Sequence, residues 1–164
     1  MNFYEQENNK TVLKTREIIR ELPEFCNEFF LDLNQNTLPK TRMGYAYDLR
    51  VFFNFLVTEN KEFLGRDIKS LTLDDLQKIK VVDINQFMDY LAYYVSDEDS
   101  QLYSNGENGK ARKLAAVRKL FKYFYRTEKI SSNPAELTIT PKRHEKEIVR
   151  LEPNEVAEML DIIE

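Results

Sequence analysis

The sequence predicts an all-α protein, a small helical bundle of four to five core helices with an additional helical segment at its amino end. Only four glycines and five prolines occur among the 164 residues, and 42% of the residues are hydrophobic. This composition favours packed helices over disorder or a turn-rich β fold. Apolar residues also recur at helical spacing along much of the chain. The length suits one domain and the start of a second.

The additional segment at the amino end, residues 1–36, is expected to contain two short helices. Its apolar residues follow a helical period from Val12 to Leu33, and Pro23 interrupts this pattern. A residue before proline avoids the helical region, whereas proline itself suits a first helical turn. Cys26 lies in the apolar stripe of the second helix, so we expect a buried thiol rather than a nucleophile.

The clearest amphipathic helix is expected from Pro39 to Val57, near the start of a core domain over residues 37–137. Pro39 suits the first turn of this helix. Five apolar residues fall on one face, which should therefore be turned toward the core. They are Tyr45, Leu49, Phe52, Phe53 and Leu56.

Two further helices are expected before a loop. Thr72 and Asp75 form a capping-box pattern with Asp in place of Glu, which predicts a short helix. A second helix, from about Val82 to Val95, has a single apolar stripe. The stripe comprises Ile84, Phe87, Met88, Leu91 and Val95. Residues 96–108 have no periodicity and many turn-forming residues, so we expect a loop there.

A basic helix from Lys110 to Lys129 is expected after this loop. Eight of its residues are Lys or Arg, and only Glu128 is acidic. On a helical wheel the apolar residues share one face, and cations and a tyrosine share the opposite face. The apolar face comprises Leu114, Val117, Leu120, Phe121 and Phe124, and the opposite face comprises Arg112, Lys119, Tyr123 and Arg126, with Lys122 at its border.

This concentration of positive charge predicts a DNA partner. The whole chain has a net charge of −4, but residues 101–150 contain twelve Lys or Arg against five Asp or Glu. Like charges on one helix repel each other, and DNA phosphates would relieve that repulsion while releasing counterions. The alternative is that the helix pairs with the acidic surfaces of residues 59–100. The residues of this helix expected to contact DNA are Lys110, Arg112, Lys113, Lys119, Lys122, Tyr123 and Arg126.

Three weaker features complete the pattern. Lys40, Thr41 and Arg42 begin the Pro39 helix, where hydroxyls and helix N-terminal amides commonly bind phosphate. Residues 138–150 are polar and basic, which indicates a linker whose Lys142 and Arg143 would also contact DNA. Residues 151–164 predict an amphipathic helix, which we interpret as the first helix of a second domain.

Several of these residues form an ordered set of motifs along the chain. The set comprises Thr41, Tyr45, Asp48-Leu49, Phe52, Phe55-Leu56, residues 110–124 and Asn133-Pro134. In this order, and followed by a basic linker and a further helix, the set resembles the amino-terminal core-binding domain of tyrosine recombinases. These are the phage-type integrases and the Xer-type resolvases.

The resemblance implies a SAM-like helical bundle that clamps duplex DNA at a recombination half-site. Its partners would be double-stranded DNA and other recombinase protomers on the same DNA. In the family, the catalytic Arg, Lys and His residues and the tyrosine nucleophile lie in the domain that follows. The resemblance therefore implies no catalysis by this stretch, although the full-length protein would break and rejoin DNA. It also suggests a bacterial or mobile-element origin.

The composition limits the alternative functions. One His, His144, and one Cys predict no metal site, and nothing indicates a cofactor or a small-molecule substrate. No apolar run is long enough to cross a bilayer, so we expect a cytoplasmic protein without a membrane partner. Two alternatives remain open. One is a stand-alone helical DNA-binding regulatory or adaptor protein without recombinase activity, and the other is a helical protein-interaction module.

Overall fold

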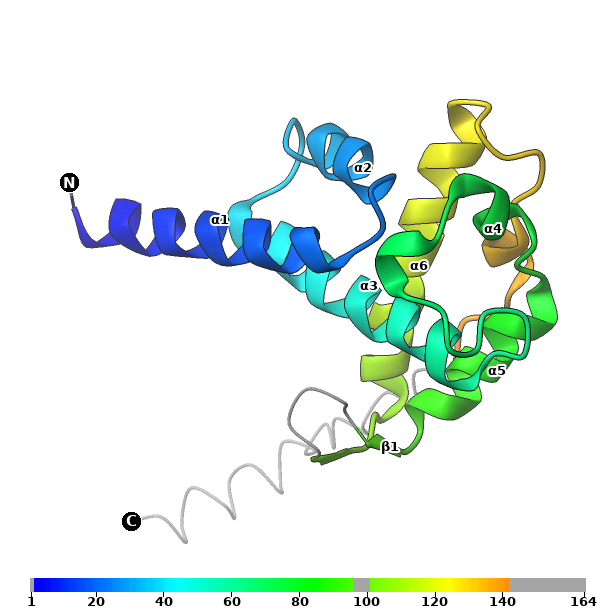
Figure 1. Cartoon of the computed structure of the whole chain (residues 1–164). Coiled ribbons are helices and arrows are strands. Elements are labelled where there is room, and N and C mark those ends of the chain that lie inside the picture. Colours follow the sequence, from blue (N-terminus) through cyan, green and yellow to red (C-terminus); the bar gives the residue numbers. More distant parts are fainter. Residues whose placement is uncertain (1, 96–100, 142–164) are drawn as a thin grey trace, which may run out of the picture.

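The computed structural model describes residues 2–95 and 101–141, and these residues form a helical bundle (Figure 1). The predicted all-α class is confirmed. The α-helices are α1 (Phe3–Glu21), α2 (Cys26–Leu33), α3 (Pro39–Glu59), α4 (Leu73–Gln77), α5 (Val81–Leu91) and α6 (Glu107–Arg126), and they are joined by two short 3₁₀ helices, η1 (Ile68–Ser70) and η2 (Pro134–Leu137), and by strands β1 (Tyr94–Val95) and β2 (Leu102–Tyr103). The predicted linker residues Lys142 and Arg143 and the predicted helix of residues 151–164 lie outside the described residues.

Helix α1 begins nine residues earlier than the apolar period, which starts at Val12, because Asn2 caps it. The Asn2 side chain accepts a hydrogen bond from the Glu5 backbone N–H at 2.8 Å, and the Glu5 carboxylate accepts one from the Asn2 backbone N–H at 3.3 Å. This capping box pairs backbone groups that the helix itself leaves unpaired. The amino-terminal half of α1 projects away from the bundle, and Phe3 and Tyr4 are exposed there (Figure 1).

The core is built around α3 and α6, which cross in the centre of the bundle. Helix α1 packs along α3, and α1 and α2 contribute to the same core cluster as the later helices. The largest fully buried side chains are mainly aromatic. They include Phe29, Phe52, Phe53, Phe63, Phe87, Phe121 and Phe124. The Phe25 ring contacts the rings of Phe53 and Phe124 edge-on, with centroid distances of 5.9 and 5.5 Å.

The connection between α5 and α6 differs from the prediction. Helix α5 ends at Leu91 rather than at Val95, because both the backbone N–H and the side-chain amide of Asn105 donate to the Leu91 carbonyl, at 3.2 and 2.9 Å. Tyr94 and Val95 form β1, which pairs with β2 in an antiparallel hairpin, and Tyr94 lies opposite Tyr103. Because these two rings stack with their centroids 5.6 Å apart, part of the predicted loop is ordered as a sheet.

The basic helix α6 also has different ends from the prediction. It begins at Glu107 and ends at Arg126, rather than running from Lys110 to Lys129. Glu128 adopts a left-handed conformation with φ 63°, and the Lys129 backbone N–H returns to the Phe124 carbonyl at 2.9 Å. This is a Schellman termination, for which glycine is the usual residue. Because position 128 is a glutamate rather than a glycine, this termination could not be predicted from the sequence.

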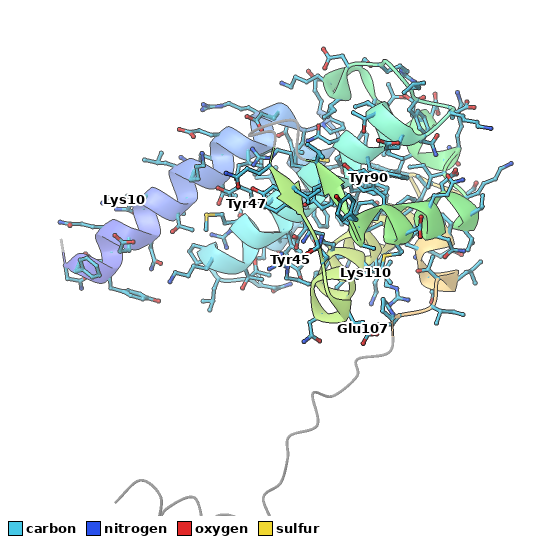
Figure 2. The ribbon with its side chains drawn as sticks, turned by 90° about the horizontal axis from the view of Figure 1, so that it is seen from below. Lys10, Tyr45, Tyr47, Tyr90, Glu107 and Lys110 are labelled. Carbon is cyan, nitrogen blue, oxygen red and sulfur yellow. The ribbon has the colours of Figure 1, made fainter. Side chains whose placement is uncertain are left out.

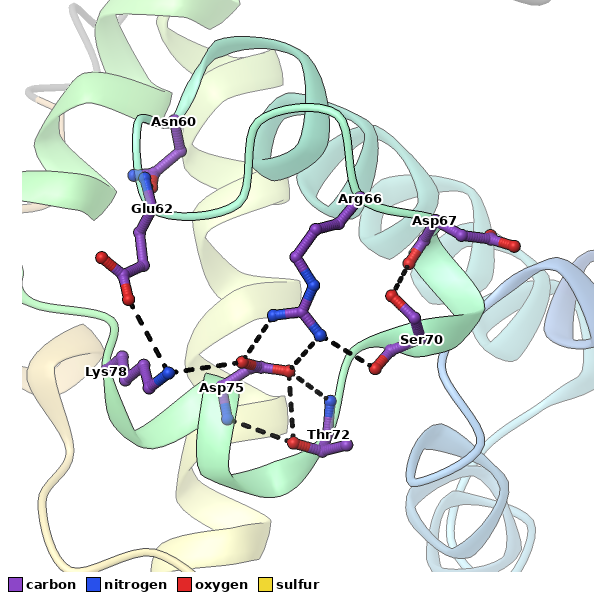
Figure 3. A network of polar contacts seen from close by, with 8 residues as sticks. All are labelled: Asn60, Glu62, Arg66, Asp67, Ser70, Thr72, Asp75 and Lys78. Atoms are coloured by element: carbon purple, nitrogen blue, oxygen red, sulfur yellow. Dashed lines mark hydrogen bonds and ion pairs between the residues drawn. The ribbon is translucent and has the colours of Figure 1, made fainter.

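A polar network fixes the connection between α3 and α5 (Figure 3). Arg66 donates two hydrogen bonds to the Asp75 carboxylate, at 2.7 and 2.9 Å. The same carboxylate accepts from the Thr72 backbone N–H at 2.9 Å, and Thr72 and Asp75 form the predicted capping box. These donors hold the pKa of Asp75 below its usual value despite burial, which acts in the opposite direction, and the Arg66 contact is the largest cause.

The aromatic core gives a first prediction. Phe124→Ala should lower the free energy of unfolding by about 3–5 kcal/mol, because it leaves a cavity between α6 and the Phe25 ring. Tyr125→Ala, at the neighbouring half-exposed position, should change that free energy by less than about 0.5 kcal/mol. Urea denaturation of both variants tests this, and equal effects would contradict the packing described here.

The Asp75 network gives a second prediction, on pH dependence. A lowered folded-state pKa contributes stability that is complete above the carboxyl's unfolded pKa of about 4 and is lost as pH falls through the folded value. Asp75→Asn should lower the free energy of unfolding at neutral pH by about 1–3 kcal/mol. It should also reduce the loss of stability below about pH 4. Thermal unfolding from neutral to acidic pH measures both effects, with the exposed Asp89→Asn as control.

Candidate nucleic-acid interface

The two predicted faces of α6 are confirmed by burial. The apolar residues are fully buried, and they are Leu114, Val117, Leu120, Phe121 and Phe124. Most of the opposite residues are exposed, and they are Arg112, Lys119, Lys122 and Arg126, whereas Tyr123 is half-buried. Helix α6 therefore presents a cationic surface while it anchors the core.

The amino-terminal part of α6 pairs with a buried carboxylate. Asp48 on α3 is only 3% exposed, and its Oδ1 lies 3.3 Å from Nη2 of the exposed Arg112. Burial raises the pKa of Asp48, whereas the positive charges of Arg112 and Lys113 oppose that rise. Asp48 belongs to the family motif, but its position beneath the basic helix could not be predicted from the sequence.

Lys113 is not on the exposed face, although it was predicted to contact DNA. The residue is 6% exposed, and its Nζ donates to Oδ1 of Asn105 at 2.9 Å. Burial lowers the pKa of Lys113, and the Asp48 carboxylate opposes this change. Gly109 leaves room for the Asn105 side chain, because a Cβ at this position would lie 2.8 Å from Asn105 Oδ1. Asn105 therefore joins α6 to the end of α5.

A groove of about 680 Å³ lies beside Asp48 and Lys113, between α3, α5, α6 and the hairpin. Tyrosines from three elements line it together with Arg112 and Asp48. The tyrosines are Tyr47, Tyr90, Tyr94 and Tyr103. Figure 2 marks Tyr47 and Tyr90 on this side of the molecule, with Lys110 near the amino end of α6. The Tyr90 and Tyr94 rings stack at 5.0 Å, which extends the ring contact made across the hairpin.

The middle of α6 faces α2 across a smaller groove of about 220 Å³. Lys119 and Lys122 line this groove from α6, and Phe29, Asp32 and Asn36 lie on its other side. Within the described residues, the side chains of Lys119 and Lys122 form no ion pair. The structure therefore brings two of the predicted DNA contacts together as exposed cations.

The carboxy-terminal end of α6 is paired with acidic residues of α2. Arg126 lies 3.4 Å from the Asp32 carboxylate, and Lys129 Nζ lies 2.6 Å from the Glu28 carboxylate. The Tyr123 hydroxyl donates to Glu28 at 3.1 Å. Burial and this hydrogen bond to an anion raise the pKa of Tyr123. Acidic partners within residues 59–100 were the alternative predicted from the sequence, whereas these partners come from α2.

Arg118 was counted among the basic residues of this helix but was not predicted to contact DNA. Its guanidinium donates to the carbonyl of Ala135 at 3.2 Å, and it also contacts the Thr138 carbonyl and the Thr140 hydroxyl. Arg118 therefore attaches the segment after η2 to the bundle. Thr138 and Thr140 are among the first residues of the linker predicted over residues 138–150.

The start of α3 lies near two arginines of α1. Lys40 and Thr41 are exposed, and the half-buried Arg42 donates to the Thr37 carbonyl. Arg42 also lines a cleft of about 470 Å³ between α1, α2 and α3, together with Arg16 and Arg20 of α1. These two arginines were not predicted from the sequence, although their spacing of four residues places them on one helical face.

Among the described residues, no group of three or more His, Cys, Asp or Glu side chains is arranged to hold a metal ion. No described helix is both long and apolar enough to span a membrane. Cys26 is buried, and burial raises the pKa of its thiol far above the usual range.

The fold and this surface define a helical protein whose cationic face suits a polyanionic partner. Comparison with curated proteins then identifies relatives named tyrosine recombinase XerC. The relative from Caldanaerobacter subterraneus subsp. tengcongensis is 32% identical over 150 residues, which cover 87% of this chain and 40% of the relative. The relative from Chlorobaculum parvum is 34% identical over 130 residues, which cover 79% of this chain and 34% of the relative.

A more distant relative, from Leptospira interrogans, is 26% identical over 86% of this chain and 42% of its own length. The chain resembles the tyrosine recombinase family over most of its length, and the predicted resemblance is confirmed. It spans about 40% of the length of the first of these relatives. No family model matches the chain, and the search of solved structures found no significant match.

The buried contact between α5 and α6 gives a third prediction. Asn105→Ala should lower the free energy of unfolding by about 1–3 kcal/mol, because it removes the acceptor of the buried Lys113 ammonium. Asn108→Ala, at an exposed position in the first turn of α6, should have a much smaller effect. Urea denaturation at neutral pH compares the two variants, and an Asn105 variant as stable as the Asn108 variant would contradict the role given to this contact.

Proposed function

We propose that this chain is the DNA-binding part of a site-specific tyrosine recombinase, and that it clamps duplex DNA at a recombination half-site. One observation carries the proposal: α6 is anchored by a fully buried apolar face while Lys119 and Lys122 remain exposed on its other side. Such cations neutralise phosphates and release counterions, which gives strong, salt-dependent affinity. The XerC relatives match the part of the chain that contains this helix.

Further contacts would come from both ends of this surface. Arg112 and Lys110 would contact phosphates near the amino end of α6, and Lys40, Thr41 and Arg42 would do so at the start of α3. Thr41 and the first turn of α3 offer hydroxyl and backbone N–H donors, which suit a phosphate oxygen. Lys142 and Arg143 would extend the surface along the linker.

We also propose that this chain grips DNA and does not itself cleave it. The tyrosine nucleophile of the family attacks phosphate with cations around it, as the resemblance implies. Tyr123 lies beside Arg126, but its hydroxyl donates to Glu28 and its pKa is raised. A raised pKa makes a phenol a weaker nucleophile at neutral pH. The same proposal gives a DNA-binding domain over residues 37–137 and a linker over residues 138–150. It also has the chain bind DNA beside other recombinase protomers.

The two alternatives differ from this proposal in testable ways. A regulatory DNA-binding protein would bind DNA with no recombinase domain in the full-length protein, and the names of the relatives favour the recombinase. A protein-interaction module would bind duplex DNA weakly and without the steep salt dependence of phosphate contacts.

The exposed cations of α6 give the fourth prediction. Lys119→Gln combined with Lys122→Gln should weaken binding to duplex DNA at low salt and reduce the slope of log K against log salt by about 2. The matched control is Lys61→Gln with Lys69→Gln, which removes the same charge from exposed positions between α3 and α4. Fluorescence anisotropy with a labelled duplex at several salt concentrations measures both. Equal losses in the two double variants would refute this surface as the binding site.

A further inference from the structure

We propose that Glu28 and Asp32 of α2 set the edge of the DNA footprint on α6, because they pair with Arg126 and Lys129 and so offset the positive charge at that end. This inference rests on the proposed function, since it concerns where DNA lies on the same helix. It changes the role of Tyr123 and Arg126 from DNA contacts to members of an internal clasp, defined here as Glu28, Asp32, Tyr123, Arg126 and Lys129.

The clasp is closely paired. The Glu28 carboxylate accepts from Lys129 Nζ at 2.6 and 2.7 Å and from the Tyr123 hydroxyl at 3.1 Å. Asp32 pairs with Arg126 at 3.4 Å, and the Arg126 guanidinium lies 5.8 Å from the centre of the Tyr123 ring. Each residue of the clasp therefore has a polar partner within it.

The chain positions these groups from both sides. Glu28 and Asp32 are four residues apart, so they lie on one face of α2. The intervening Phe29 and the following Leu33 are buried, which fixes that face against α6. The Schellman turn at Glu128 reverses the chain after α6 and returns Lys129 toward α2. The Phe29 ring also contacts the Tyr123 ring, with centroids 6.0 Å apart.

The clasp divides the cationic face of α6 into two parts. All four cations are exposed, but Lys119 and Lys122 have no ion-pair partner among the described residues, whereas Arg126, one turn after Lys122, and Lys129, beyond the end of α6, have carboxylate partners. A phosphate at that end would meet two carboxylates together with the two cations paired with them, so it would find no net positive charge within the Debye length of about 8 Å. It would also have to displace an existing ion pair, so it gains less than it does at an exposed lysine.

This arrangement has a consequence for register. Phosphate contacts fix how a domain sits on the duplex, although they carry no sequence information. A helix that is cationic along its whole length would allow the duplex to shift toward either end. Two carboxylates at one end make such a shift unfavourable, and they confine the duplex to the part of α6 that precedes Tyr123.

The experiment measures duplex binding by Glu28→Gln combined with Asp32→Asn. Loss of two anions and release of two cations should raise affinity at low salt roughly threefold to tenfold and steepen the salt slope by about 2. The matched control is Glu59→Gln with Asp89→Asn, which changes net charge by the same amount at exposed positions elsewhere. Affinity of the α2 variant no higher than that of the control would overturn the proposal.

A second pair of variants keeps the test decisive if the α2 variant does not fold, as judged by thermal unfolding. Arg126→Gln with Lys129→Gln should leave the slope of log K against log salt within about 0.5 of the wild-type value, since these cations do not contact phosphate. A decrease in that slope as large as the decrease in the Lys119 and Lys122 double variant would overturn the proposal. Failure of the proposed function looks different, because the wild-type chain would then show no salt-dependent binding to DNA.

Discussion

The packing of α6 across α3 is the constraint on which the other features of this molecule depend. The buried face of α6, from Leu114 to Phe124, fills the centre of the bundle. Phe25 contacts rings from both helices at 5.9 and 5.5 Å, so the turn between α1 and α2 is fixed to their crossing. This contact places α2 beside the outer face of α6. The position of every charge on α6 relative to its neighbours follows from that one helix crossing.

Because about half of the surface of α6 is buried, its many cations lie in different electrostatic environments. Lys113 lies next to the core and is stabilised by Asn105 and by the charge of Asp48. Arg118 donates to backbone carbonyls of the segment after η2. At the far end, α2 supplies carboxylates. The cations that remain exposed, Lys119 and Lys122 among them, are a selected subset, because the fold itself uses the others.

The helices and their buried faces could be predicted from the sequence, because apolar periodicity reports directly which side of a helix faces the core. The capping box of Thr72 and Asp75 was also visible, since it is a local pattern. The partners of the cations were not, because Glu28 and Asp32 lie about a hundred residues from Arg126 and Lys129 along the chain. A helical wheel separates apolar from polar faces, but it cannot distinguish an exposed lysine from one that meets a carboxylate of another helix. Lys113 shows the same limit, because its place at the edge of the apolar face depends on Asn105 and Gly109.

The partial neutralisation of α6 is compatible with the proposed clamp, because such a clamp does not need high affinity in each half. A domain that contacts few phosphates binds DNA weakly on its own. Linking it to a second DNA-binding domain makes the second contact intramolecular, so the two domains together bind DNA far more tightly than either one alone. When two linked domains bind together, additional cations at the end of α6 would raise the non-specific affinity for DNA and slow the release of DNA. A defined edge of the contact surface instead fixes the position of the duplex along α6. The net charge of −4 then fits the same logic, since the binding surface is local and the acidic remainder of the chain limits contacts elsewhere on DNA.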